Sequence, residues 1–314
     1  MFDFIGNKKY FFGFSALIMI AGIIGLIAHQ GLNYDIQFQG GTILEFQMKG
    51  ENFDLNKAVT VAQETTGKIV SAQSSSPVDT TNNEKINMLV LSVSSSGALS
   101  EEEHESLVNA IKQNFEVKEN TEVTTRHVDP VMGRELAFKS VFSIVIASIL
   151  MILYVWIRFK VMGGLLAGIS AVIALLHDVM VMITLYAITD LPVNDSFIAA
   201  ILTIVGYSIN DTIVIFDRIR ENSTLLRKEN LNSITNKSIK QTLSRTINTA
   251  LTTVLCVLTV YIFASYNDIE SIRNFMLPLL VGLVSGTYST IFIASPAWVM
   301  LKERQAKKQA TAKA

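Results

Sequence analysis

An acidic residue lies in the middle of a long apolar segment of this chain. Residues 196–222 read SFIAAILTIVGYSINDTIVIFDRIREN and are apolar enough to cross a bilayer, yet they contain Asn210 and Asp211. At about 1.5 Å per residue, Asp211 lies roughly 20 Å below a boundary at Ser196, within a hydrocarbon core about 30 Å thick. A carboxylate there costs on the order of 3 kcal/mol, so it must be paired or protonated. Asp211 is therefore a candidate proton site, and the alternative is a structural polar pair that faces a neighbouring helix.

Polar residues extend along one face of the same segment and along the apolar segment that follows it. Their helical spacing predicts that both faces turn toward protein and away from lipid. The first series is Thr203, Gly206, Tyr207, Asn210, Asp211 and Asp217, and the second is Arg245, Thr249, Thr252, Cys256 and Thr259.

The composition limits the class of protein. Of 314 residues, 50% are hydrophobic and 17% are charged, which is too apolar for one soluble domain and too charged for a chain wholly in the membrane. A net charge of −1 argues against a nucleic-acid partner. The single cysteine, Cys256, excludes an intramolecular disulfide, and no metal-ligand spacing appears. Because there is also no phosphate-binding loop and no nucleophile–base pair, we expect no cofactor, no metal and no enzymatic activity.

Six apolar segments are long enough to span a membrane. They cover residues 10–28, 135–156, 163–188, 196–222, 247–265 and 272–300. A secretory signal peptide is the alternative for the first segment, but no small-residue cleavage site follows it. The predicted organisation is an N-terminus with the first span (1–30), an outer domain (31–132), spans two to six (133–301) and a basic, disordered tail (302–314). Residues 223–245 are basic and are expected to form an interfacial helix.

The charges between the spans predict the orientation. Basic residues collect before span one, after span two, after span four and in the tail, and six spans place all of these on one side. The short loops 189–195 and 266–271 contain acidic residues and no Lys or Arg. By the positive-inside rule both termini are cytoplasmic, and residues 31–132 lie outside.

The outer segment alternates between strand and helix patterns. Strands are predicted at 34–48, 68–74, 84–93 and 116–128, with a polar loop at 71–83. Helices are predicted at 53–66, capped by Asp54, and at 100–115, where Ser100 and Glu103 form a capping box. This βαββαβ order predicts an α+β, ferredoxin-like domain.

Two charged residues and several glycines are expected to act between the spans. Arg245 begins the fifth span, where it either turns inward to pair alternately with Asp211 or snorkels to the headgroups. Asp178, about 15 Å below the outer surface, is close enough in height to couple to Asp211 if their faces meet. Gly206, together with the small-residue pair Gly282 and Gly286, is expected to permit close contact between helices.

Several stretches of the chain resemble the SecF family of bacterial protein-export membrane subunits. They are NYDIQFQGG (33–41), VDPVMGREL (128–136), LHDV (176–179), GYSINDT (206–212) with FDRIREN (216–222), and TLSRT (242–246).

The resemblance implies a six-span half of an assembly similar to the resistance-nodulation-division transporters, with a SecD subunit as the other half. It places the protein in the bacterial cytoplasmic membrane beside the SecYEG channel, drawing a translocating unfolded polypeptide outward with proton or sodium flux. It implies that Asp211 and Arg245 are tied to ion use, with Asp178 as a further member. Asn210 and threonines such as Thr212 could supply oxygen ligands to sodium.

Two other functions remain open from the sequence. The chain could be half of a cation-driven exporter of small molecules or lipids, or a membrane scaffold in which Asp211 is structural.

Overall fold

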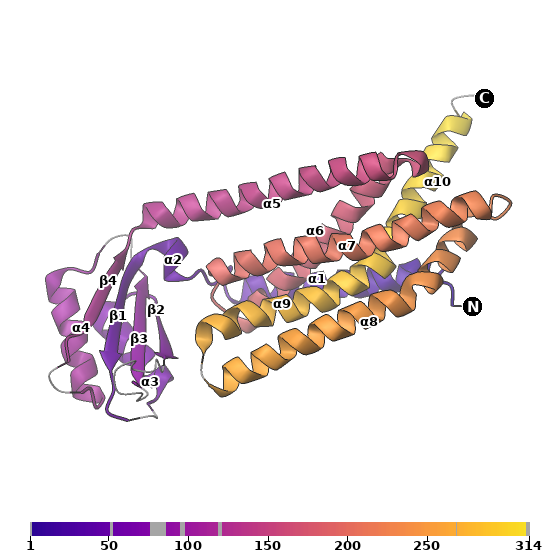
Figure 1. Cartoon of the computed structure of the whole chain (residues 1–314). Coiled ribbons are helices and arrows are strands. Elements are labelled where there is room, and N and C mark those ends of the chain that lie inside the picture. The colour runs from indigo at the N-terminus through magenta and orange to yellow at the C-terminus, as the bar shows by residue number, and fades with distance from the viewer. Residues whose placement is uncertain are drawn as a thin grey trace. The chain divides into compact units, whose positions relative to one another are not determined.

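The described part of the chain forms two compact units (Figure 1). The computed structural model describes residues 2–50, 53–75, 86–94, 98–118, 121–267 and 269–311. We call residues 1–33, 142–261 and 274–314 the helical unit, and residues 34–141 and 262–273 the sheet unit. Each unit encloses its own hydrophobic core.

Long helices account for most of the chain, and the unit boundaries fall within three of them. The helices are α1 (Lys8–Ala28), α5 (Pro130–Arg158), α6 (Gly164–Thr189), α7 (Asp195–Leu225), α8 (Leu231–Tyr266), α9 (Glu270–Ser289) and α10 (Ser295–Thr311). A 3₁₀ turn, η1 (Lys160–Met162), precedes α6, and a π-helical turn, η2 (Thr290–Ala294), joins α9 to α10.

Within the described residues, six helical segments are long and apolar enough to cross a membrane, and each overlaps one of the six predicted spans. Large apolar side chains on these helices face outward: Leu17 is 64% exposed, Leu150 60% and Leu251 54%. Such a surface is typical of contact with lipid. The chain is a multi-pass membrane protein.

The structure differs from the sequence prediction after the fourth and sixth spans. Residues 231–245 of the basic segment are helical but continue without a break into the fifth span as α8, where hydroxyl side chains bond back to the preceding turn. Residues 223–225 of the same segment belong to the end of α7. Thr235 Oγ1 donates to Leu231 O at 2.8 Å, and Ser238 Oγ donates to Ile234 O at 2.8 Å. The predicted disorder of the tail is wrong for residues 302–311, which belong to α10. The Lys, Glu, Arg, Gln and Ala residues of this segment are strong helix formers and extend the helix.

Aromatic side chains fill the core of the helical unit. Phe159, Phe216 and Trp298 are almost fully buried, with ring centroids 6.0 Å apart for the first pair and 6.2 Å for the second. Phe4 and Ile5, ahead of α1, belong to the same core.

The sheet unit contains four antiparallel strands in the spatial order β2-β3-β1-β4. Along the chain its elements are α2 (Ile36–Gln39), β1 (Gly41–Gln47), α3 (Leu55–Thr66), β2 (Val70–Ser75), β3 (Met88–Ser94), α4 (Glu101–Asn114) and β4 (Thr124–Val128). Alternate residues of the central strands, such as Leu44 and Leu91, are buried with Leu107 and Ile111 of α4. The Asp54 cap and the Ser100–Glu103 capping box are both present, as predicted.

The first predicted strand of this unit is wrong at its start. Asp35 caps α2, a single helical turn, and the strand begins only at Gly41. Gly40 and Gly41 have φ values of 80° and 144°, and a Cβ on Gly41 would lie 2.1 Å from the carbonyl oxygen of Val93. Only glycine fits so close an approach between strands. Of the predicted polar loop, residues 71–75 belong to β2, and 76–83 lie outside the described residues.

Candidate functional site

Asp211 is a buried acid in the middle of α7. Its side chain is 4% exposed, and its Oδ2 has no hydrogen-bond partner among the described residues. The buried hydroxyl of Tyr207, one turn earlier, interacts with Thr253 of α8. Buried polar atoms are nearly always hydrogen-bonded in folded proteins, so the unpartnered Oδ2 of Asp211 marks a place where a proton or another group can bind.

Thr212, the next residue, points into the helical unit. It is 2% exposed, and its hydroxyl lies 3.1 Å from Ser208 O and 3.0 Å from Thr290 Oγ1. The hydroxyl is therefore bonded to α9–η2 and to its own helix.

Of the other predicted ion-coupling residues, Arg245 on α8 lies close enough to act electrostatically on the Asp211 carboxyl, but the described residues contain no ion pair between the two. Arg245 and Asn210 are both exposed. On the rest of the predicted polar face of α8, Thr252, Cys256 and Thr259 are exposed and Thr249 is half-buried. Much of the polar face of α7 and α8 is thus uncovered in this chain.

Asp178 occupies a different environment on α6. It is 1% exposed, and three serine hydroxyls from two other helices donate to its carboxylate. The contacts are Ser285 Oγ to Oδ1 at 2.6 Å, Ser208 Oγ to Oδ2 at 2.8 Å and Ser289 Oγ to Oδ2 at 2.8 Å. We call Asp178 with these three residues the serine cage. The cage ties α6, α7 and α9 together deep in the helical unit.

His177 completes this cluster. Its Nδ1 lies 3.3 Å from Asp178 Oδ1, whereas its Nε2 is buried without a partner among the described residues. The ring is 5.8 Å from that of Tyr288 on α9.

The sequence analysis missed Ser208, Ser285, Ser289 and Thr290. The spacing of Ser285 and Ser289 could have indicated a shared polar face, because the two serines are four residues apart in an apolar helix. Which acid they would meet could not be inferred from that spacing.

The three predicted packing glycines behave differently. A Cβ on Gly282 would lie 2.5 Å from Ile204 Cγ1, and one on Gly286 would lie 3.2 Å from Ser208 Cβ, so both permit close approach of α9 to α7. Gly206 is exposed, and a Cβ there would meet nothing within 4 Å in this chain. The expectation of close packing at Gly206 within this chain is therefore wrong, because Gly206 lies on the open face of α7.

Comparison with known proteins decides the family. The family model for the C-terminal part of the protein export membrane proteins SecD and SecF matches residues 107–304. The protein translocase subunit SecF of Alicyclobacillus acidocaldarius is 36% identical over 98% of this chain and 95% of its own length. The chain belongs to the SecF family of protein translocase subunits.

Longer relatives contain this SecF-like region as one part. The protein translocase subunit SecDF of Bacillus subtilis is 38% identical over 98% of the present chain, which spans 39% of that relative. The crystal structure of SecDF from Thermus thermophilus superposes with a TM-score of 0.76 at 31% identity, covering 96% of this chain and 39% of that one. A structure of SecDF in a super-membrane-facing form gives a TM-score of 0.70 at 32% identity, over 100% of this chain and 40% of that one.

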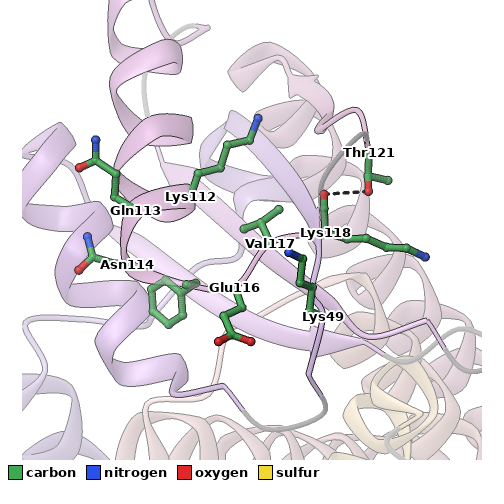
Figure 2. A pocket seen from close by; sticks show the side chains of 9 residues that line it. Lys49, Lys112, Gln113, Asn114, Glu116, Val117, Lys118 and Thr121 are labelled. Carbon is green, nitrogen blue, oxygen red and sulfur yellow. Dashed lines mark hydrogen bonds between the residues drawn. The ribbon is translucent and has the colours of Figure 1, made fainter.

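The sheet unit of this SecF-family chain has a surface hollow of about 580 Å³ (Figure 2). It is formed by the end of α4, the segment after it and Lys49, and Thr121 Oγ1 donates to Lys118 O at 3.0 Å beside it. Lys49, Lys112 and Lys118 are exposed. The hollow is therefore a basic patch open to solvent, unlike an enclosed ligand site with buried polar groups.

Proposed function

We propose that this chain is an ion-coupled accessory subunit of the Sec translocase, which uses the proton motive force to promote late-stage translocation and release of preproteins across the bacterial cytoplasmic membrane. The observation that carries the proposal is Asp211, buried on a membrane-spanning helix with an oxygen that no described residue satisfies. An acid in lipid is costly unless it is paired or protonated, and such residues are commonly functional. The proton or sodium ion would bind there.

The partner that covers the open polar face would be a SecD subunit. Arg245 is exposed at the start of the apolar part of α8, where contact of its charge with lipid is unfavourable, and Thr252 and Thr259 are exposed further along the same helix. The relatives named SecDF are more than twice as long as the region they share with this chain, and the remainder of such a protein could supply the missing surface. In this arrangement Asn210 and Arg245 face the SecD subunit, and Asp211 lies at the edge of the ion site that the two subunits form together.

Alternation of Asp211 between a protonated state and a charged state paired with Arg245 would drive the transport cycle. With Arg245 distant, the carboxyl takes up a proton; when the helices move and the guanidinium approaches, the charged pair is favoured and the proton leaves. One charge that crosses about 100 mV supplies roughly 2.3 kcal/mol, which is enough to bias a motion between two states. Asn210 and Thr212 would line the path, and their oxygens also suit sodium.

The sheet unit would act on the exported chain. We propose that its βαββαβ order and β2-β3-β1-β4 sheet are those of a ferredoxin-like domain, residues 31–132, on the outer side of the membrane. The distribution of basic residues supports cytoplasmic termini, spans at 1–30 and 133–301, and a cytoplasmic tail at 302–314. The other partners would be the SecYEG channel, the unfolded polypeptide and the surrounding lipid.

Replacing Asp211 with Asn tests the proposal. In cells carrying the SecD partner, D211N should abolish the stimulation of preprotein release by the proton motive force while leaving the chain inserted. Asp217→Asn is the matched control, because this acid of the same helix is 42% exposed and already paired with Arg158 and Arg220. Unchanged release in D211N would contradict ion coupling. Efflux of a small molecule or lipid from vesicles that contain this chain alone would favour an exporter instead.

A further inference from the structure

We propose that Asp178 is a fixed buried anion that positions Asp211 through the hydroxyls of α7 and η2, and that it does not itself carry the transported ion. The inference deepens the proposed function and rests on Asp211 as the ion-binding acid. It separates two acids that the sequence grouped together.

The hydrogen bonds of the serine cage are those of an ionised carboxylate. Both oxygens of Asp178 accept from serine hydroxyls, and the shortest contact, 2.6 Å from Ser285, lies in the range of charge-assisted O–H···O⁻ bonds. A protonated acid would need an acceptor for its own hydrogen, so one serine would stop donating to Asp178. Ser289 is the serine placed to do this, because its hydroxyl also lies 3.2 Å from Gly286 O. The cage therefore favours the ionised form of Asp178, whereas an ion-carrying carboxyl must pass readily between its ionised and its protonated form.

His177 strengthens the same state. With its proton on Nδ1, the ring donates a fourth hydrogen bond to Asp178 and leaves only a lone pair at the buried Nε2. A charged ring would instead leave a buried N–H group without a partner among the described residues, which costs more than an unmet lone pair. The neutral ring is therefore favoured, and the cluster retains one negative charge.

The surroundings of the cage supply few other charges. Within seven residues of a cage residue along α6, α7 and α9, the titratable side chains other than Asp178 are His177 on α6, Tyr207 and Asp211 on α7, and Tyr288 on α9. Among the described residues, the basic side chain within 4 Å of Asp178 is His177, whose Nδ1 lies 3.3 Å from Asp178 Oδ1 and which in its neutral form adds no charge. A surface hollow of about 420 Å³ reaches His177 and Ser285, but most of its lining is apolar, so it is a poor path for water or ions.

Ser208 links the cage to the ion-binding acid. Its hydroxyl donates to Asp178, and its carbonyl oxygen accepts from Thr212 at 3.1 Å and from Thr290 at 3.4 Å. Thr212 directly follows Asp211, and Thr290 directly follows the cage residue Ser289. The Thr212–Ser208 bond lies within α7, but Ser208 also bonds Asp178 of α6 and Thr290 of η2, and Thr212 bonds Thr290 at 3.0 Å. These bonds between elements hold the rotation of α7 about its axis, and with it the direction in which Asp211 points.

The π-helical turn η2 begins at the same place. It starts at Thr290, immediately after Ser289, and Ser295 Oγ bonds the carbonyl oxygen of Thr290 at 3.1 Å. π-turns widen a helix locally and are frequent at functional sites. Here the turn lets consecutive residues, Ser289 and Thr290, reach Asp178 and α7 respectively.

Labelling with N,N′-dicyclohexylcarbodiimide, an apolar reagent for protonated carboxyls, tests this assignment. The full chain is labelled together with its SecD partner in membranes between pH 5 and 9, and adducts are located by mass spectrometry. We expect the labelling of Asp211 to fall as the pH rises, with a measurable midpoint, and Asp178 to remain unlabelled at every pH. Removing two donors in S285A/S289A should shift the Asp211 midpoint by about half a pH unit, or about threefold in proton affinity.

Thr287→Ala is the matched control, because among the described residues this α9 hydroxyl donates to the carbonyl oxygen of Leu283 in its own helix. It should leave the midpoint unchanged. Labelling of Asp178 in the unmodified chain would show it to be a carrier and overturn the proposal, as would cage variants with an unshifted Asp211 midpoint. If Asp211 never reacts at any pH, ion coupling itself fails and the positioning role fails with it.

Discussion

Gly282 of α9 lies directly against Ile204 of α7, so that a Cβ added to the glycine would be 2.5 Å from Ile204 Cγ1 and 3.1 Å from Met182 Sδ. The backbone of α9 therefore approaches α7 closely, one turn from the cage residue Ser285. Close helix contact of this kind is how small residues stabilise membrane bundles.

Gly282→Ala should consequently destabilise the helical unit. The clash involves Ile204 near its branch point, which cannot turn away freely, and overpacking of this kind costs about 1–3 kcal/mol. Thermal denaturation in detergent should show a lower midpoint for G282A. Gly13→Ala is the control, because a Cβ on that glycine meets nothing within 4 Å. Equal midpoints for the two variants would argue against the close contact.

Asn236 on α8 clamps the segment ahead of α1. Its Oδ1 accepts from the backbone N–H groups of Phe4 at 2.8 Å and Ile5 at 3.2 Å, and its Nδ2 donates to Asp3 Oδ1 at 2.7 Å. Asn236→Ala leaves these donors unpaired and should lower the local opening free energy by about 1–3 kcal/mol. Hydrogen exchange of the Phe4 and Ile5 amides should accelerate, while Asn232→Ala, an exposed position of the same helix, should leave it unchanged.

The capping box of α4 should make this part of the sheet unit sensitive to acid. The Lys68 ammonium, which lies 2.8 Å from both Glu103 oxygens, holds the pKa of that carboxyl below its ordinary value of 4.5. A lowered folded pKa gives stability that is present above pH 4.5 and is lost as pH falls through the folded value. The protection factors of the first-turn amides of α4, taken against the intrinsic exchange rate at each pH, should therefore fall in that range. Glu103→Gln should remove this pH dependence, and its persistence would show another group to be responsible.

Cys256 offers a test of the partner surface without any added cysteine. It is the chain's single cysteine and is exposed on the open polar face of α8. If SecD covers this face, a membrane-permeant maleimide should react much more slowly with Cys256 when SecD is present. A cysteine at Leu17 of α1, 64% exposed, in a C256S chain is the control and should react equally in both cases. Equal reactivity of Cys256 with and without SecD would place the interface elsewhere.

Local patterns were sufficient to predict most of the elements. The six spans, the Asp54 cap and the Ser100–Glu103 capping box depend on apolar length and on bonds within four residues, so they can be inferred from neighbouring residues. The prediction of helix boundaries failed where residues that often end a helix were followed by a strongly helical segment. The Ser- and Asn-rich segment before Arg245 was predicted as an interfacial helix separate from the fifth span, whereas its hydroxyls bond back within α8, which continues into that span.

The presence of acids at lipid depth follows from the sequence, because a carboxylate within an apolar segment can be recognised from its neighbours. The side chains that surround each acid depend on how the helices pack. Asp178 receives hydroxyls from positions as far as 111 residues away, whereas Oδ2 of Asp211 receives none from the described residues. Helical spacing gives the face on which a side chain lies, but the rotation of one helix against another depends on contacts across the whole bundle. Two aspartates that looked alike in the sequence therefore acquire different environments.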